Sequence, residues 1–367
     1  MAEQCEMKPR NRGVDALRIL ATLMVLILHV LNIGQILSQM SAEQPAYWMC
    51  MVLFVAAFGA VNCYGLISGY VGLFSRYRYS KLILLWLQVV FYNLLALLVV
   101  TIAGRRLPQV AELLRAMTPL LHLSFWYFTA YFGMFFLIPV MNRGLRALTR
   151  QQARAVFWSI FVLFSVLPTL TGADQFVTQV GYSVIWLVLL YILGGCIRKG
   201  ELFSRAPTWV LLLLFWICVA LSLLVRWLLP EPILLFGAIY QGYTLISYTA
   251  PTVLFCAVIL LVIFSRMKCT GSAGKLVAIL APASFGIYIM HMQQDLRPLI
   301  FETPLFAWIS QQNAAVAPLT VLLTALVLFV ICAAIEMVRQ RLFRVLNVQT
   351  ALEKLENKLL GKLWDDK

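Results

Sequence analysis

The segment GVDALRILATLMVLILHVLN, residues 13–32, is the first long apolar stretch of the chain, and it carries a charge at Arg18 and an imidazole at His29. An ionisable side chain within a membrane is costly, and it marks a functional candidate there. The two residues are eleven positions apart, so a helix returns to within about 20° of its starting direction after about 16 Å of rise. The segment therefore predicts one membrane helix with Arg18 and His29 on the same face.

The composition indicates an integral membrane protein. Of the 367 residues, 62% are hydrophobic and only 12% are charged, and the mean hydropathy is +0.88. A soluble domain of this length has more charged surface, so we expect an all-α, polytopic membrane protein built as one helix bundle among membrane lipids. The net charge of +14 does not indicate nucleic-acid binding, because most cations fall in short connections between apolar stretches. The eight cysteines lack metal-ligand spacing, so no metal site is expected.

About ten transmembrane helices are predicted, because a span needs about 20 apolar residues. The fifth and ninth stretches are short, as expected of helices that are tilted or partly covered by their neighbours. The ten stretches are 14–37, 49–73, 81–103, 123–141, 155–172, 179–197, 207–229, 246–265, 276–293 and 315–338.

The positions of Lys and Arg predict the orientation of the chain. Cations concentrate in alternate connections and in the tail, whereas the other connections hold only a few arginines. The positive-inside rule then places both termini of this multi-pass protein in the cytoplasm, with the spans in the plasma membrane. The first stretch is too long for the core of a cleaved signal peptide. The cation-rich segments are 8–12, 76–81, 143–154, 198–205, 266–275 and the tail from Arg339.

Two regions of the chain are expected. Residues 1–340 form the transmembrane domain, and residues 341–367 form a cytoplasmic amphipathic tail. Charges and leucines alternate over 353–360 of the tail, which predicts a short helix lying on the inner membrane surface.

The polar residues of the first span allow a functional and a structural interpretation. Asp15 lies three positions before Arg18, on nearly the same helix face, and could hold its guanidinium. Alone, Arg18 could be a cation that snorkels to the inner headgroups. His29 could be a packed histidine that hydrogen-bonds a neighbouring helix. The structural interpretations lose weight because both residues share one face.

The second span ends in small and polar residues. Asn62, Ser68 and Gly69 lie there, followed by Tyr70. Small residues allow close helix packing, and they also allow a ligand to approach the backbone. The spacing does not decide between these two interpretations.

Two later segments add candidate substrate-lining residues. Trp126 and Tyr127 begin the fourth span, where they fit an interfacial aromatic belt equally well. Ser284, Tyr288 and His291 are spaced by four and three residues, so they form a polar stripe on one helix face of the ninth span.

Glu336 is the acidic residue of the last span, and its partner is open at this stage. It could pair with Arg18 inside the bundle, or with Arg339 or Gln340 at the surface. The sequence has no GxSxG nucleophile elbow, no phosphate-binding P-loop and no GxGxxG fingerprint. A covalent serine enzyme and an ATP-driven pump are therefore poorly supported.

Three segments together resemble the membrane-bound acyltransferase 3 family. The run GVDALR at 13–18 with His29 is similar to the family's Arg-x10-His motif. The segments LISGY at 66–70 and SFGIYIMH at 284–291 resemble two further family blocks in the same order. The resemblance covers residues 10 to 340 and matches the ten spans and the two cytoplasmic termini.

The resemblance implies an O-acyltransferase that moves an acetyl or similar short acyl group from cytoplasmic acyl-CoA to a hydroxyl of a surface carbohydrate or lipid-linked sugar. It implies that His29 is the catalytic histidine and Arg18 the essential arginine. Matching motif positions with less settled roles are Asp15, Ser68, Gly69, Tyr70, Tyr288 and His291. No SGNH-type hydrolase domain follows the spans, so a two-step transfer would need a separate protein.

We expect the donor, acetyl-CoA, to be bound through its phosphates by cytoplasmic cations, because the planar guanidinium suits phosphate. Arg18 is the main candidate, and Arg76, Arg78 and Lys81 are weaker ones. His29 then acts as general base on the acceptor hydroxyl. No permanently bound cofactor is expected. A transporter or flippase for a surface glycan or its lipid-linked precursor is the alternative, and direct transfer, an acyl-His29 intermediate and the oligomeric state all stay open.

Overall fold

The computed structural model describes residues 10–235 and 238–361, and nearly all of their regular structure is helical. The expected all-α class is therefore confirmed. The first half of the chain forms α1 (Arg12–Asn32), α2 (Ile36–Gln39), α3 (Pro45–Ala57), α4 (Ala60–Gly72), α5 (Tyr79–Ala103), α6 (Val110–Met117), α7 (Trp126–Phe135), α8 (Ile138–Ala147), α9 (Arg150–Phe161), η1 (Val162–Val166) and α10 (Leu167–Thr171).

The second half contains the remaining helices and one short hairpin. The hairpin pairs β1 (Ile233–Leu235) antiparallel with β2 (Ala238–Tyr240). The other elements are η2 (Gln179–Gly181), α11 (Val184–Gly200), α12 (Thr208–Leu228), α13 (Pro251–Arg266), α14 (Gly271–Leu280), η3 (Ala281–Ala283), α15 (Ser284–Met292), α16 (Arg297–Phe301), α17 (Pro304–Ser310), α18 (Val316–Val345) and α19 (Val348–Leu360).

Among the described residues, seven helical segments are long and apolar enough to cross a membrane. The expected count of about ten is not confirmed. The other three predicted stretches coincide with shorter helices: α7 followed by α8, α11 and α13. α11 and α13 have 17 and 16 residues, and most of their side chains are buried against other helices. The seven segments are Arg12–Gln39, Pro45–Gly72, Tyr79–Ala103, Arg150–Thr171, Thr208–Leu228, Gly271–Met292 and Val316–Val345.

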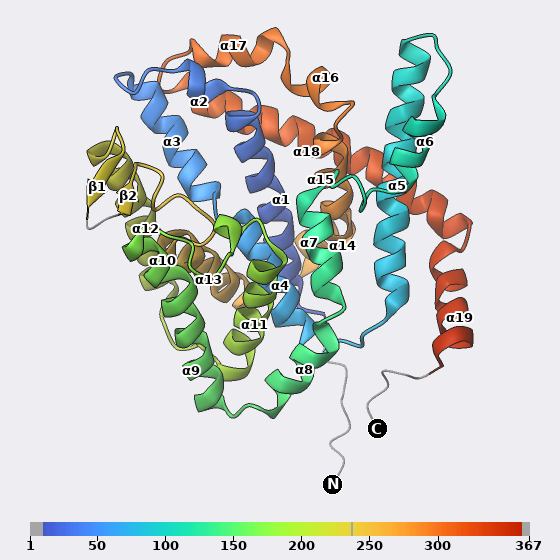
Figure 1. Ribbon diagram of the computed structural model, residues 1–367, viewed down its shortest axis with the longest axis horizontal. Helices are drawn as coiled ribbons and strands as arrows, with labels where there is room; N and C mark the ends of the chain where they lie inside the picture. The colour runs from blue at the N-terminus through green and yellow to red at the C-terminus, as the bar shows by residue number, and fades with distance from the viewer. Residues whose placement is uncertain (1–9, 236–237, 362–367) are drawn as a thin grey trace.

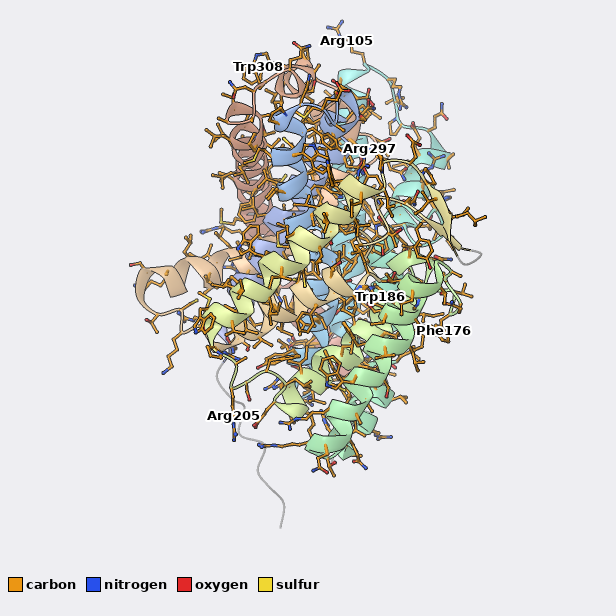
Figure 2. The ribbon with its side chains drawn as sticks, turned by 90° about the vertical axis from the view of Figure 1, so that its left-hand side faces the viewer. Arg105, Phe176, Trp186, Arg205, Arg297 and Trp308 are labelled. Carbon is orange, nitrogen blue, oxygen red and sulfur yellow. The ribbon has the colours of Figure 1, made fainter. Side chains whose placement is uncertain are left out.

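α1 is the central element of the bundle. It packs against α3, α4, α13, α15 and α18, so both polar residues of the first span lie inside the protein. Figure 1 shows α2, α16 and α17 at one end of the molecule and α8 and α9 at the other. Arg105 and Trp308 lie at the first end and Arg205 at the second (Figure 2). Arg105 and Arg205, which belong to different sets of connections in the sequence, thus lie at opposite ends.

Close packing of α4 against α11 depends on glycine. A Cβ atom on Gly69 would lie 1.8 Å from the carbonyl oxygen of Tyr191, and one on Gly194 would lie 2.1 Å from that of Leu66. No side chain fits at either distance, so the two backbones touch directly. This contact supports the structural interpretation of the small residues in the second span, which is close helix packing.

The tail forms the helix α19 beside α5 (Figure 1). Glu356 accepts hydrogen bonds from the backbone N–H groups of Tyr79 and Ser80, at 2.8 and 3.2 Å. These N–H groups have no partner within α5, because they belong to its first turn. A short helix in the tail is therefore present, and its position relative to a membrane stays a prediction. The expected boundary at residue 340 falls inside α18, and residues 362–367 lie outside the described part.

Candidate active site

Two histidines meet at the centre of the bundle. Nδ1 of His29 on α1 lies 2.7 Å from Nε2 of His291 on α15, and the ring centroids are 5.0 Å apart. His291 is fully buried, whereas His29 is half-buried. The sequence places both residues on polar helix faces, but their direct contact was not predicted.

The hydrogen bonds of His291 fix the proton positions of the neutral pair. Nδ1 of His291 lies 2.6 Å from the carbonyl oxygen of Ile287, which can only accept, so this nitrogen carries the proton. Nε2 of His291 then has a lone pair and accepts the N–H of His29 Nδ1. The remaining nitrogen, Nε2 of His29, is therefore left with a lone pair. It can take a proton or attack a carbonyl.

Arg18 is held by Asp15, as the spacing on α1 predicts. The carboxylate of Asp15 is 2% exposed and accepts from Arg18 at 2.6 Å and from Arg10 at 2.5 Å. The bond to Asp15 uses one of the five N–H groups of the Arg18 guanidinium. The Arg18 side chain keeps 28% exposure. This arrangement holds a cation in place while leaving part of it accessible.

Tyrosines lie between the arginine and the histidines. The Tyr64 hydroxyl contacts Thr22 Oγ1 at 2.6 Å and the carbonyl oxygen of Arg18 at 3.3 Å. The Arg18 charge acts electrostatically on Tyr64, Tyr127 and Tyr131. This line of aromatic rings continues from Tyr127 to Tyr288, whose ring centroids are 6.1 Å apart.

Tyr288 completes this line, because its ring centroid lies 6.2 Å from that of His291. Ser284, the first residue of the predicted stripe, is buried at the start of α15. Two of the stripe's three residues, Tyr288 and His291, are thus placed directly in the line from Arg18 to His29. Tyr64, Tyr131 and Thr22 were not singled out by the sequence, because nothing in a tyrosine or threonine within an apolar span distinguishes it from a packing residue.

The second-span candidates serve structural contacts. Asn62 is buried, donates to the carbonyl oxygen of Tyr248 at 2.7 Å and accepts from the Trp186 indole at 3.0 Å. Ser68 donates to the carbonyl oxygen of Tyr64 at 2.8 Å. The carbonyl oxygen of Tyr70 accepts from Arg198 at 2.7 Å. The bonds of Asn62 and Tyr70 tie α4 to α11 and to the loop before α13, whereas the bond of Ser68 stays within α4.

Trp126 and the predicted donor-binding cations lie at the edges of this arrangement. The Trp126 ring packs on Tyr182, at 4.7 Å between centroids, and next to Tyr127. Arg76, Arg78 and Lys81 lie at the turn that leads into α5, where Lys81 Nζ donates to the carbonyl oxygen of Arg76 at 2.8 Å. Their part in binding a donor stays a prediction.

Glu336 is paired with Arg339 and not with Arg18. Arg339 donates to its carboxylate at 2.5 and 3.0 Å, and Gln340 donates at 2.9 Å. The pair is buried, with side-chain exposures of 8% for Arg339 and 0% for Glu336, so the expected surface location is wrong. Burial is possible because α5 supplies two further donors, Tyr92 at 2.5 Å and Gln88 at 3.2 Å.

The comparisons with known proteins give one match. A family model described as an acyltransferase domain matches residues 11–337, which is nearly the whole chain. No curated protein and no solved structure matches the sequence. Within residues 10–235 and 238–361, no group of three or more His, Cys, Asp or Glu residues is placed to hold a metal ion.

Proposed function

The chain belongs to the acyltransferase 3 family and is a membrane acyltransferase, and we propose that it moves an acetyl or similar short acyl group from acyl-CoA to a hydroxyl of a carbohydrate acceptor. The observation that carries this proposal is the His29–His291 pair, which leaves one basic nitrogen on His29. The match to the family supports the reaction class, and the identities of donor and acceptor are our proposal.

The transfer step uses the lone pair on His29 Nε2. The acceptor hydroxyl gives its proton to this nitrogen while its oxygen attacks the thioester carbonyl. The C–S bond then breaks, and the CoA sulfur leaves with the proton that His29 held. During the step His29 is positively charged, and its Nδ1–H bond to His291 becomes a charge-assisted hydrogen bond, which is about twice as strong as a neutral one. Burial of His291 keeps water away from this bond.

The donor approaches from the Arg18 end. We propose that Arg18, held by Asp15, binds a phosphate of acyl-CoA at the cytoplasmic side of the plasma membrane, with Arg76, Arg78 and Lys81 as further contacts. The Tyr64 hydroxyl contacts the carbonyl oxygen of Arg18 at 3.3 Å, and the Arg18 charge acts electrostatically on Tyr64 and Tyr131; this supports a polar route toward His29. The acceptor then meets the acyl group at the other end of α1.

The test measures transfer of radiolabelled acetyl from acetyl-CoA to surface glycan in membranes that contain the protein. We expect His29→Ala to lower the rate by about 10²–10⁴-fold, the usual contribution of a general base. His122→Ala is the matched control, because His122 is exposed and lies outside the pair; its rate should equal that of the unchanged protein. A His29→Ala rate equal to the control would refute the proposal. Movement of unmodified glycan without acetyl transfer would support a transporter.

A second measurement tests the donor site. Arg18→Gln should weaken acetyl-CoA binding to the purified protein by about tenfold, because a charge-assisted bond is lost. Arg105→Gln, at the opposite end of the molecule, should bind acetyl-CoA like the unchanged protein. Equal affinity in the two variants would place the phosphate site elsewhere.

A further inference from the structure

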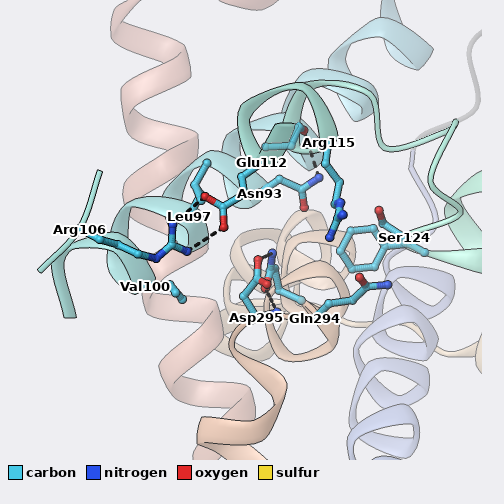
Figure 3. Close-up of a pocket in the computed structure, with 12 residues that line it drawn as sticks. Asn93, Leu97, Val100, Arg106, Glu112, Arg115, Ser124, Gln294 and Asp295 are labelled. Atoms are coloured by element: carbon cyan, nitrogen blue, oxygen red, sulfur yellow. Dashed lines mark hydrogen bonds and ion pairs between the residues drawn. The ribbon is translucent and has the colours of Figure 1, made fainter. Parts of the chain in front are cut away.

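A polar cavity lies at the end of the molecule opposite Arg205. It offers about 70 Å³ between α5, α6, the segment before α7 and the segment after α15, and it is partly open to the outside (Figure 3). A water molecule needs about 10–15 Å³ measured in this way, so the cavity has room for about five. A small polar ligand group fits there.

Two aromatic rings in series, Phe125 and Tyr288, separate the cavity from the histidine pair. Gln293, Gln294 and Asp295 line it and follow His291 closely in the chain. Phe125 also lines it, and its ring centroid lies 6.2 Å from that of Tyr288. Tyr288 in turn contacts His291. A ligand in the cavity therefore lies two ring contacts away from His291 and does not touch it.

The charges around the cavity balance. Arg106 donates two hydrogen bonds to Glu112, at 2.8 and 2.7 Å. Arg115 acts electrostatically on Glu112, and Asp295 acts on Arg106. Two cations and two anions thus line one space, and their formal charges sum to zero.

The uncharged and charged side chains together offer both donors and acceptors. Figure 3 shows Arg115, Ser124, Gln294 and Asp295 around the same opening. Asp295 is fixed in place, because the buried Gln293 donates to its carboxylate at 3.1 Å and accepts from its backbone N–H at 2.6 Å. A sugar hydroxyl is both donor and acceptor, so it can pair with each of these groups.

We propose that this cavity is an acceptor subsite that receives hydroxyl groups of a neutral sugar unit beyond the unit that is acylated, while the rest of that sugar lies outside the opening. The assignment rests on the proposed function, because it takes the His29–His291 pair as the reaction centre. The neutral lining gives the carboxylate of an acidic sugar no net attraction that would offset the cost of its desolvation, and this selects against an acidic sugar. A neutral unit pays no such penalty and satisfies the mixed donors and acceptors.

The test compares binding of two probes to the purified full-length protein: a neutral trisaccharide, and a trisaccharide of the same size that contains one hexuronic acid. The unchanged protein should bind the neutral probe more tightly. Asp295→Asn removes one negative charge from the lining and should weaken the neutral probe while raising the acidic-to-neutral affinity ratio by about tenfold. Arg115→Gln should shift the ratio in the opposite direction.

Glu302→Gln is the matched control, since Glu302 is exposed at the C-terminal end of α16 and does not line the cavity. It should leave both affinities unchanged. Equal affinity of both probes in every variant, or no binding of the neutral probe, would overturn the subsite. Acetyl-CoA binding is measured in parallel and shows that each variant is folded. Sugar binding without acetyl transfer would reject the proposed function but not the subsite. Acetyl transfer with an unaltered sugar preference in Asp295→Asn would reject the subsite but not the proposed function.

Discussion

His291 sets the chemistry of His29 through a single hydrogen bond. In a neutral pair, Nε2 of His291 accepts the N–H of His29, and Nδ1 of His291 donates to the Ile287 carbonyl. The tautomer of one ring therefore fixes the tautomer of the other. His291 is in this sense a positioning residue. In the proposed mechanism it orients the base and stabilises the charge that the base acquires, without touching the substrate.

Replacing His291 therefore tests the pair. We expect His291→Ala to lower acyl transfer by about 10²-fold, because His29 loses the acceptor that fixes its tautomer. His291→Gln should retain more activity, since the side-chain oxygen of glutamine can accept the same N–H. Acetyl-CoA affinity should stay constant in both variants, and the pH at which transfer reaches half its maximum should move. Equal activities of the two variants, or an unmoved pH profile, would argue for a purely packing role.

The residues of the site differ in how far the sequence could predict them. Asp15 and Arg18 share one helix, so the helical period alone predicts their contact, and the structure shows it at 2.6 Å. The His29–His291 contact joins residues 262 positions apart, and no local pattern carries such information. Glu336 shows the same limit: its local partner Arg339 was a candidate, but its burial depends on Tyr92 and Gln88 from a distant helix.

At the scale of elements, the contact of α4 with α11 is the most demanding. Gly69→Ala should destabilise the protein by about 3 kcal/mol or more, because the new methyl group meets backbone atoms of Tyr191 that cannot rotate away. The measurement is thermal unfolding of the purified protein in detergent. Gly144→Ala is the control: this glycine lies in α8 with no atom within 4 Å of an added Cβ. An equal unfolding temperature for both variants would contradict the packing argument.

The short helix α6 is tied down by a titratable group. Hydrogen bonds from Arg106, together with one from the Gln109 backbone, hold the pKa of Glu112 at about 2, below its usual value. Since the folded-state pKa is depressed, the stabilisation is complete above the ordinary carboxylate pKa of about 4.3. It weakens as the pH falls below that value and is lost below about 2.

Hydrogen exchange of the α6 backbone amides measures how strongly Glu112 stabilises this helix. We expect protection, corrected for the intrinsic exchange rate, to be constant between pH 7 and 5 and to fall between pH 4 and 2. Glu112→Gln should remove the pH-dependent part, because its amide does not titrate. An identical fall in the variant would assign the effect to another group.

The prediction of membrane spans from hydropathy is limited by the length and the breaks of individual helices. Hydropathy finds the stretches 179–197 and 246–265, because α11 and α13 are mostly apolar up to the basic residues of their last turns, although both helices begin five residues later than predicted. Hydropathy does not predict how long each helix is, since a helix buried by neighbours need not cover the thickness that a lipid-facing helix must. The break at Phe58–Gly59 between α3 and α4 was likewise absent from the single stretch predicted at 49–73.

For the whole molecule, the alternation of arginines leads to a labelling prediction. In a background whose reactive cysteines are replaced by serine, Glu43→Cys should react with an impermeant thiol reagent added outside intact cells. Gly144→Cys should react only after the membrane is opened. Gly144 lies in α8, at the end of the molecule opposite α2, and Glu43 lies between α2 and α3. Both positions are exposed, so lack of access cannot mimic protection. The reverse pattern would invert the proposed topology.

The separation of the two histidines along the chain has a consequence for biosynthesis. Ribosomes add roughly 5–20 residues per second, so the 262 positions between them correspond to roughly 15–50 s of translation. During that interval α1 is already made while its imidazole has no partner from α15. A chain released before residue 291 cannot assemble the pair at all. If the pair is the reaction centre, as proposed above, competence for acyl transfer is therefore acquired late, when the ninth predicted span docks on the first.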